Sequence, residues 1–320
     1  MNHLISIIVP CYNEQESLPL FYNEIILTMN TMKTSYNIDY ELIFVDDGSK
    51  DNTLFMLKDL SAQNQKVKFI SFSRNFGKES AMYAGLQNAH GDYVVVMDAD
   101  LQHPPQFIPE MYTAVALGEY DSATTRRTSR QGESEIRSFF SIIFYKLMNK
   151  ISDADIVEGA QDFRFMTRQM VDSILQLSEY NRFSKGIFSW VGFKTKYLEY
   201  ENVERVAGRT KWSFLNLLAY SLEGIFAFST TPLYISSFLG IIFCLFSIIM
   251  IFIIIIKTVI WGDPVAGFPT LICVIFFIGG LQLFCNGIVG QYLAKAYLEV
   301  KNRPIYIVKE KNTDATRKCE

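Results

Sequence analysis

The fold follows from one stretch, Tyr93-Val94-Val95-Val96-Met97-Asp98-Ala99-Asp100-Leu101-Gln102-His103-Pro104-Pro105. Its first five residues predict a buried strand, and the two prolines open a new segment. Ligands of open α/β sheets bind outside the carboxyl ends of the strands, where Asp98 and Asp100 fall. No basic residue lies near them in the sequence, so they predict a Mg²⁺ or Mn²⁺ ion that holds a diphosphate. A solvated turn at the strand end is the alternative.

The chain before this stretch alternates predicted strands with predicted helices. Strands are expected at 4–10, 40–45 and 67–72, and helices at 15–32, 54–60 and 79–89. Such alternation implies parallel pairing in a doubly wound α/β sheet. Each strand ends in a polar cluster, and the clusters should converge on one sheet edge as a binding cleft. Neither G-x-G-x-x-G nor G-x-x-x-x-G-K-[ST] occurs, which disfavours a dinucleotide-dependent dehydrogenase and a P-loop enzyme.

Composition narrows the class of protein further. The net charge of −3 provides no global basic field, so nucleic acid is not expected as a partner. The five cysteines show no paired spacing, which argues against a disulfide framework or a zinc site. The N-terminal segment has a strand pattern instead of a secretory signal, so the polar part of the chain is expected in the cytoplasm.

The C-terminal third predicts attachment to a membrane. No charged residue occurs at 224–256 or 264–294, and each run exceeds the roughly 20 residues that span a bilayer. We expect a catalytic domain at 1–211, an interfacial amphipathic helix at 212–231 and a basic tail at 295–320. Between them, 232–294 should form two transmembrane helices, at about 233–256 and 268–293. The basic tail predicts that both termini are cytoplasmic.

Several motifs carry a family resemblance. Val9-Pro10-Cys11-Tyr12-Asn13-Glu14, Asp46-Asp47-Gly48-Ser49 and Asp98-Ala99-Asp100 resemble the signature of glycosyltransferase family 2. The segments 73–79, 161–164, 208–212 and 297–304 are similar to its polyisoprenyl-phosphate branch, which includes dolichol-phosphate mannose synthase and bacterial undecaprenyl-phosphate glucosyltransferases. The resemblance implies a GT-A-type nucleotide-sugar-binding domain with a mostly parallel sheet, a bacterial inner-membrane location and a homotetramer.

The same resemblance implies roles for individual residues. Asp98 and Asp100, with Gln102, would face the metal and the diphosphate, and Asp162 would be the acceptor-side carboxylate, with Asp100 and Asp162 as the catalytic pair. The nucleotide sugar would be held by Pro10, Tyr12, Glu14, Asp46, Asp47, Arg74, Lys78 and Asp98.

Two basic clusters are candidates for the acceptor phosphate, because arginine forks suit phosphate oxygens. The first contains Arg126, Arg130 and Arg137. The second contains Arg205, Thr210 and Lys211, and Thr210 stands where the family has a serine. A solvated charged loop is the alternative for the first cluster. The second could instead meet anionic lipid head groups.

The acceptor chemistry predicts what Asp162 does. The second pKa of a phosphate monoester is about 6, so most of the acceptor is already a dianion at neutral pH. We therefore expect Asp162 to orient the acceptor more than to remove a proton. The alternative is a structural ion pair between Asp162 and Arg164.

Together these features predict a metal-dependent, membrane-anchored glycosyltransferase. It would move a hexose from a nucleotide sugar, UDP-glucose being favoured, to a polyprenyl phosphate, undecaprenyl phosphate being favoured. The resemblance implies inversion at the anomeric carbon. Two alternatives stay open: a processive polysaccharide synthase, whose Q-x-x-R-W signature does not occur here, and a non-catalytic nucleotide-sugar-binding membrane scaffold. The identity of the sugar and the choice between Mg²⁺ and Mn²⁺ also stay open.

Overall fold

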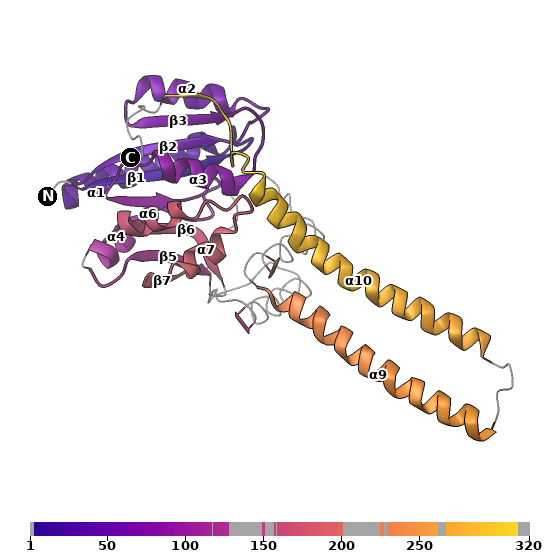
Figure 1. Ribbon diagram of the computed structural model, residues 1–320. Coiled ribbons are helices and arrows are strands. Elements are labelled where there is room, and N and C mark those ends of the chain that lie inside the picture. Colours follow the sequence, from indigo (N-terminus) through magenta and orange to yellow (C-terminus); the bar gives the residue numbers. More distant parts are fainter. Residues whose placement is uncertain are drawn as a thin grey trace. The chain divides into compact units, whose positions relative to one another are not determined.

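The computed structural model describes residues 3–116, 118–127, 149–150, 157, 159–200, 225–226, 229–261 and 267–312. The chain forms two compact units (Figure 1). The first contains Met1–Ser221 together with Arg303–Glu320, and the second contains Leu222–Asn302. The predicted amphipathic helix at 212–231 lies mostly outside the described residues.

The described part of the first unit is built on an eight-stranded sheet in the order β7-β5-β6-β4-β1-β2-β3-β8. The pairs β1–β2, β1–β4, β2–β3 and β5–β7 are parallel, and the other three are antiparallel. The predicted α/β class is confirmed, but β6 and β8 run against their neighbours. The strands are β1 (Leu4–Cys11), β2 (Asp39–Asp46), β3 (Val67–Phe72), β4 (Tyr93–Val96), β5 (Ser122–Arg127), β6 (Ala160–Thr167), β7 (Thr195–Tyr200) and β8 (Val308–Lys311).

The helices of the first unit follow the predicted alternation. The helix expected at 15–32 begins at Leu18, with a proline in its first turn, and ends before Asn37, whose φ of 52° is left-handed. The described helices are α1 (Leu18–Tyr36), α2 (Thr53–Gln63), α3 (Lys78–Asn88), the 3₁₀ turn η1 (Pro105–Phe107), α4 (Ile108–Ala116), α6 (Arg168–Gln176) and α7 (Ser184–Trp190).

The central strand β1 is buried on both faces. Ile5, Ile7 and Val9 belong to a core cluster that also contains Phe21 and other residues of α1. On the opposite face Ile8 packs so closely on α3 that a Cβ at Gly85 would lie 2.1 Å from its Cγ2 atom. Helices therefore cover both sides of the sheet, and the carboxyl ends of β1, β2 and β4 remain for a site.

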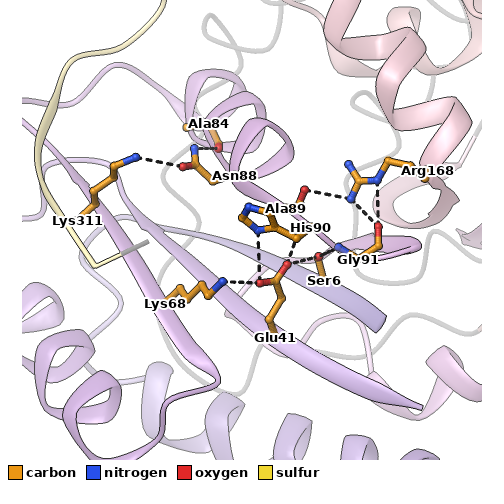
Figure 2. Close-up of polar contacts among 10 residues, drawn as sticks. All are labelled: Ser6, Glu41, Lys68, Ala84, Asn88, Ala89, His90, Gly91, Arg168 and Lys311. Carbon is orange, nitrogen blue, oxygen red and sulfur yellow. Dashed lines mark hydrogen bonds and ion pairs between the residues drawn. The ribbon is translucent and has the colours of Figure 1, made fainter. Parts of the chain in front are cut away.

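A polar network ties together the amino ends of these strands, away from that edge (Figure 2). The buried Glu41 carboxylate accepts hydrogen bonds from Ser6 Oγ (2.5 Å), Lys68 Nζ (2.8 Å) and the His90 amide (2.8 Å). Next to it, the Arg168 guanidinium donates to the Gly91 carbonyl at 2.6 Å. The network joins β1, β2 and β3 to the turn between α3 and β4.

Replacing Glu41 by Ala is expected to lower the free energy of unfolding by about 3 kcal/mol at pH 7, because three donors lose their acceptor. Burial raises the pKa of Glu41, but its bonds with Lys68, Ser6 and His90 outweigh that effect and hold the pKa below its ordinary value. The stabilisation is therefore complete above the unfolded pKa of about 4.3 and disappears as the pH falls through the folded pKa.

The measurement is the melting temperature of the full chain in detergent from pH 7 down to pH 3, with Glu16→Gln on an exposed glutamate as control. A Glu41→Ala deficit that is the same at both ends of this range would contradict the assignment.

The second unit contains α9 (Thr231–Trp261) and α10 (Phe268–Val300), where the sequence predicts two helices. Phe243 of α9 and Phe277 of α10 pack with ring centroids 5.4 Å apart. Within the part of the chain that the structure describes, no helix has the length and apolar character needed to cross a membrane.

Candidate active site

The loop after β2 is shaped by two adjacent carboxylates. Asp46 is buried and accepts from the Ser49 amide at 3.0 Å and from Ser71 Oγ at 2.7 Å. Asp47 accepts from the amides of Phe76 and Gly77, at 2.6 and 2.9 Å. Burial raises the pKa of Asp47 to about 6, even though these amides favour the charged form. Both side chains therefore hold loop backbone at the site edge, and their predicted contact with a nucleoside stays a prediction.

Gly48 lets the loops after β2 and β3 approach each other closely. Its φ is +68°, and a Cβ there would lie 2.5 Å from the backbone carbon of Arg74. Gly48→Ala is expected to displace the loop that leads into α3 and to lower the transfer rate at least about tenfold, since small misplacements of catalytic groups are costly. The control is Gly118→Ala, because Gly118 has a similar φ of +77° and no atom within 4 Å of the added Cβ. Equal transfer rates in the two variants would contradict this role.

Lys78 links the two most important predicted carboxylates. Its Nζ lies 2.8 Å from Asp98 Oδ1 and 2.7 Å from Asp162 Oδ2. No basic residue lies near Asp98 in the sequence, but the fold brings Lys78 to it from the first turn of α3, in line with the predicted convergence of the strand-end clusters. The alternative pairing of Asp162 with Arg164 is wrong among the described residues, since the ion-pair partner of Asp162 is Lys78.

Lys78, Asp98 and Asp162 stabilise one another's charged forms. Burial by itself lowers the pKa of Lys78, but Asp162 and Asp98 outweigh it and hold the pKa above its ordinary value. Burial raises the pKa of Asp162, but the charges of Lys78 and Lys185 outweigh it and hold the pKa well below its usual range. The side chain of Lys78 is 42% exposed, so solvent weakens these effects. Asp162 is therefore ionised throughout the neutral range.

The segment after Asp98 forms a tight turn. Asp100 Oδ1 accepts from the Gln102 amide at 3.1 Å, and Leu101 between them has a left-handed φ of 57°. His103 is buried beneath this turn, with Nδ1 3.1 Å from the Tyr200 hydroxyl. Burial lowers the pKa of His103, an effect that Asp98 and Asp100 only partly offset. A neutral His103 therefore supports the turn that carries the acidic pair.

The oxygen ligands fit a hard divalent cation. Mg²⁺ needs one or two protein carboxylates when substrate phosphates complete its shell, and Asp98, Asp100 and Gln102 supply oxygen atoms of this kind. Among the described residues, no group of three or more His, Cys, Asp or Glu side chains could hold a metal ion. A metal bound here would share Asp98 with Lys78, whose Nζ lies 2.8 Å from Asp98 Oδ1.

The remaining predicted residues are distributed as follows. Glu14, after β1, accepts from Ser17 Oγ at 2.6 Å, and Pro10 and Tyr12 are half-buried at the same strand end. Arg74 is exposed, with its guanidinium 4.0 Å above the ring of Phe76. Arg126 lies in β5, opposite Ala160 of β6. Outside the described residues are Arg130, Arg137, Arg205, Thr210 and Lys211.

Sequence reasoning missed the link between α3 and α7. Glu79 accepts the Ser184 amide at 3.1 Å and also its hydroxyl, which fixes the start of α7 beside α3. Lys185 follows directly and contributes to the lowered pKa of Asp162. The sequence places Glu79 next to Lys78, which is the one available hint that Glu79 lies near the site. Nothing in the sequence connects either residue to 184–185.

The sheet has acidic groups at its carboxyl edge, where open α/β folds bind ligands, and sequence comparison gives the family of the chain. Residues 6–175 match the model of glycosyl transferase family 2, and the chain belongs to that family. It is therefore a glycosyltransferase with the GT-A-like arrangement that the sequence predicted.

Curated relatives resemble nearly the whole chain. CsbB of Bacillus subtilis (strain 168) is 45% identical over 97% of this chain and 92% of that protein. The SfII prophage-derived bactoprenol glucosyl transferase of Shigella flexneri is 41% identical over 96% of this chain and 97% of that protein. Among solved structures, glucosyl-3-phosphoglycerate synthase from Mycobacterium tuberculosis, in complex with Mn²⁺, UDP-glucose and phosphoglyceric acid, is 18% identical, with a TM-score of 0.43 over 70% of this chain and 78% of that one.

Proposed function

We propose that this glycosyltransferase moves glucose from UDP-glucose to undecaprenyl phosphate. The observation that carries the proposal is the Lys78 bridge, in which Asp98 and Asp162 both lie within 2.9 Å of one ammonium group. We assign Asp98 to the donor side and Asp162 to the acceptor side. Relatives named bactoprenol glucosyl transferase support both the sugar and the lipid carrier. The sheet edge would thus present a donor and an acceptor to each other.

The residues of this chain would divide the work between the two substrates. Asp98, Asp100 and Gln102 would hold Mg²⁺ or Mn²⁺, which as a Lewis acid stabilises the departing diphosphate. Lys78 offsets the charge of both carboxylates. Asp162 would orient the acceptor phosphate, whose oxygen attacks the anomeric carbon from the face opposite the diphosphate, with inversion.

We further propose that α9 and α10 anchor the enzyme in the bacterial inner membrane, with both termini cytoplasmic and the chain as a homotetramer. The support for the anchor and its orientation is the absence of charged residues from 224–256 and 264–294, with basic residues crowded after 294. The homotetramer rests on the family resemblance alone. Anchoring would keep the catalytic unit at the membrane that contains the polyprenyl phosphate.

The test is transfer of label from UDP-glucose into an organic-extractable lipid by purified full-length protein with undecaprenyl phosphate. We expect one hexose added to the lipid, as read by mass, and no product in excess chelator until Mg²⁺ or Mn²⁺ is restored. A panel of other nucleotide sugars at equal concentration tests the donor. Label in a long polymer would favour a processive synthase, and donor binding without transfer would favour a scaffold.

A further inference from the structure

The loop at 73–77 connects β3 to α3 and sets the position of Lys78. Lys78 is the first residue of α3, and its Nζ lies 2.8 Å from Asp98 and 2.7 Å from Asp162. Residues 73–75 of the loop are exposed. Because an exposed segment buries few groups of its own, its position depends on the contacts that other segments make with it.

The end of the loop is held from the β2 side. Asp47 accepts the amides of Phe76 and Gly77, at 2.6 and 2.9 Å. The hydroxyl of Ser80, in the first turn of α3, donates to the Phe76 carbonyl at 3.1 Å. These bonds fix the part of the loop next to Lys78, and the beginning of the loop depends on other contacts.

The beginning of the loop is held by the segment through which the chain returns after α10. The Ser73 amide donates to the Ile307 carbonyl at 3.0 Å. The ring of Tyr306 stacks on Phe72, with centroids 4.9 Å and planes 19° apart. The hydroxyl of Tyr306 donates to Gln87 Oε1 of α3 at 2.7 Å. Tyr306 therefore joins the last residue of β3 to the helix that follows the loop.

The stack continues from Phe72 into the loop itself. Phe72 is 1% exposed, and it meets the ring of Phe76 edge-on, with centroids 5.8 Å apart. The Arg74 guanidinium lies 4.0 Å from the centroid of the Phe76 ring. Aromatic pairs in these geometries contribute more than their buried area alone. A line of contacts thus runs from Tyr306 through Phe72 to Phe76, whose amide Asp47 binds.

We propose that Tyr306 is a positioning residue for the transfer reaction, because it fixes the loop at 73–77 and thereby the place of Lys78. For its effect on rate, the proposal rests on the proposed function. Without the Tyr306 ring the loop would shift, and Lys78 would no longer bridge Asp98 and Asp162 at the same distances. A misplacement of about 1 Å can lower a rate about 10²-fold. We expect a smaller loss, about tenfold in kcat, because Asp47 still binds the other end of the loop.

The first measurement needs no transfer reaction. Full-length wild type, Tyr306→Ala and Tyr306→Phe in detergent are compared by amide hydrogen exchange and by the rate of lysine acylation, both read by mass. In Tyr306→Ala the amides at 73–77 should exchange about fivefold faster, the size expected from the loss of one aromatic pair. Lys78 should acylate about fivefold faster relative to the exposed Lys33, since an amine released from its carboxylates loses its proton more readily. Tyr306→Phe keeps the ring and should stay within about twofold of wild type.

The matched control removes a different contact of the same returning segment. Asn312 accepts the Phe69 amide at 2.5 Å and donates to the Val67 carbonyl at 3.3 Å, at the beginning of β3. Asn312→Ala is expected to lower the melting temperature without changing exchange at 73–77 or acylation of Lys78. Glycolipid formation, measured last, should have a kcat about tenfold lower in Tyr306→Ala and close to wild type in Tyr306→Phe and Asn312→Ala.

The outcomes separate this proposal from the proposed function. Wild-type exchange and acylation in Tyr306→Ala would overturn the proposal, whether or not glycolipid forms. Equal changes in Tyr306→Ala and Asn312→Ala would also overturn it, because Tyr306 would then serve only to attach β8. Should Tyr306→Ala fail to fold, Tyr306→Leu, which keeps apolar volume without a ring, decides in its place. Faster exchange and acylation, with no glycolipid from the wild type, would support the hold on Lys78 and refute the transfer reaction. Faster exchange with a wild-type kcat would refute the positioning role alone.

Discussion

Asp98→Asn is expected to lower kcat/KM for glycolipid formation by roughly 10³-fold, in the range seen when a preorganised electrostatic contact to a transition state is removed. Two consequences of the change combine. The predicted metal loses a charged oxygen ligand, and Lys78 loses one of its two carboxylate partners. With the Asp98 charge gone, Lys78 would be held by Asp162 alone.

The measurement is the initial rate at several concentrations of metal and of donor. We expect the metal concentration for half-maximal rate to rise in Asp98→Asn, while Asp59→Asn, on an exposed aspartate of α2, matches the wild type. An Asp98→Asn enzyme with wild-type kcat/KM in chelator would show that the acidic pair does not act through a metal.

Asp162→Asn is expected to lower kcat by about 10²- to 10³-fold, by the same amount at every pH from 6 to 9. The reason is the environment of Asp162, where Lys78 and Lys185 hold its pKa well below its ordinary value despite burial. A base works best with a pKa near the operating pH, so this carboxylate is poorly suited to take a proton. It is well suited to fix the position of Lys78 and of the acceptor.

The pH profile separates positioning from base catalysis. In wild type and variant alike, the rate should fall below about pH 6, where the acceptor phosphate takes up its second proton. Asp172→Asn, on an exposed carboxylate of α6, is the control. If Asp162→Asn recovered activity as the pH rose toward 9, the base role would be favoured.

The first half of the sheet was predictable because its pattern is local. The strand expected at 67–72 is β3 to the residue, and β1, β2 and β4 lie within one residue of their expected bounds. Each is mostly apolar between its ends, as a strand buried on both faces requires, and the interior polar exceptions are Ser6, Glu41, Lys68 and Ser71. The acidic turn at Asp98 and Asp100 was predictable for the same reason, since the strand that carries it is unambiguous.

The connections across the site were not predictable because they join distant segments. Lys78 and Asp162 are 84 residues apart, and Glu79 and Ser184 are 105 apart. Arg164 was considered as the partner of Asp162, since the two lie two residues apart, but tertiary packing places Lys78 there instead. The antiparallel pairing of β8 with β3 was also not predicted. It pairs Ile70 with Lys311, and it requires the chain to return to the sheet after α10, which no local sequence pattern indicates.

The return of the chain to the sheet after α10 determines how the two units are joined. The chain leaves the catalytic unit once, forms α9 and α10, and comes back to add β8 beside β3, where the Ser73 amide donates to the Ile307 carbonyl at 3.0 Å and Tyr306 stacks on Phe72 at 4.9 Å. The helical pair is thus an insertion with two attachments. A protease that nicks the chain between α9 and α10 would leave two fragments clasped by the β3–β8 seam, and release of the catalytic unit from both helices would still take a cut at each attachment.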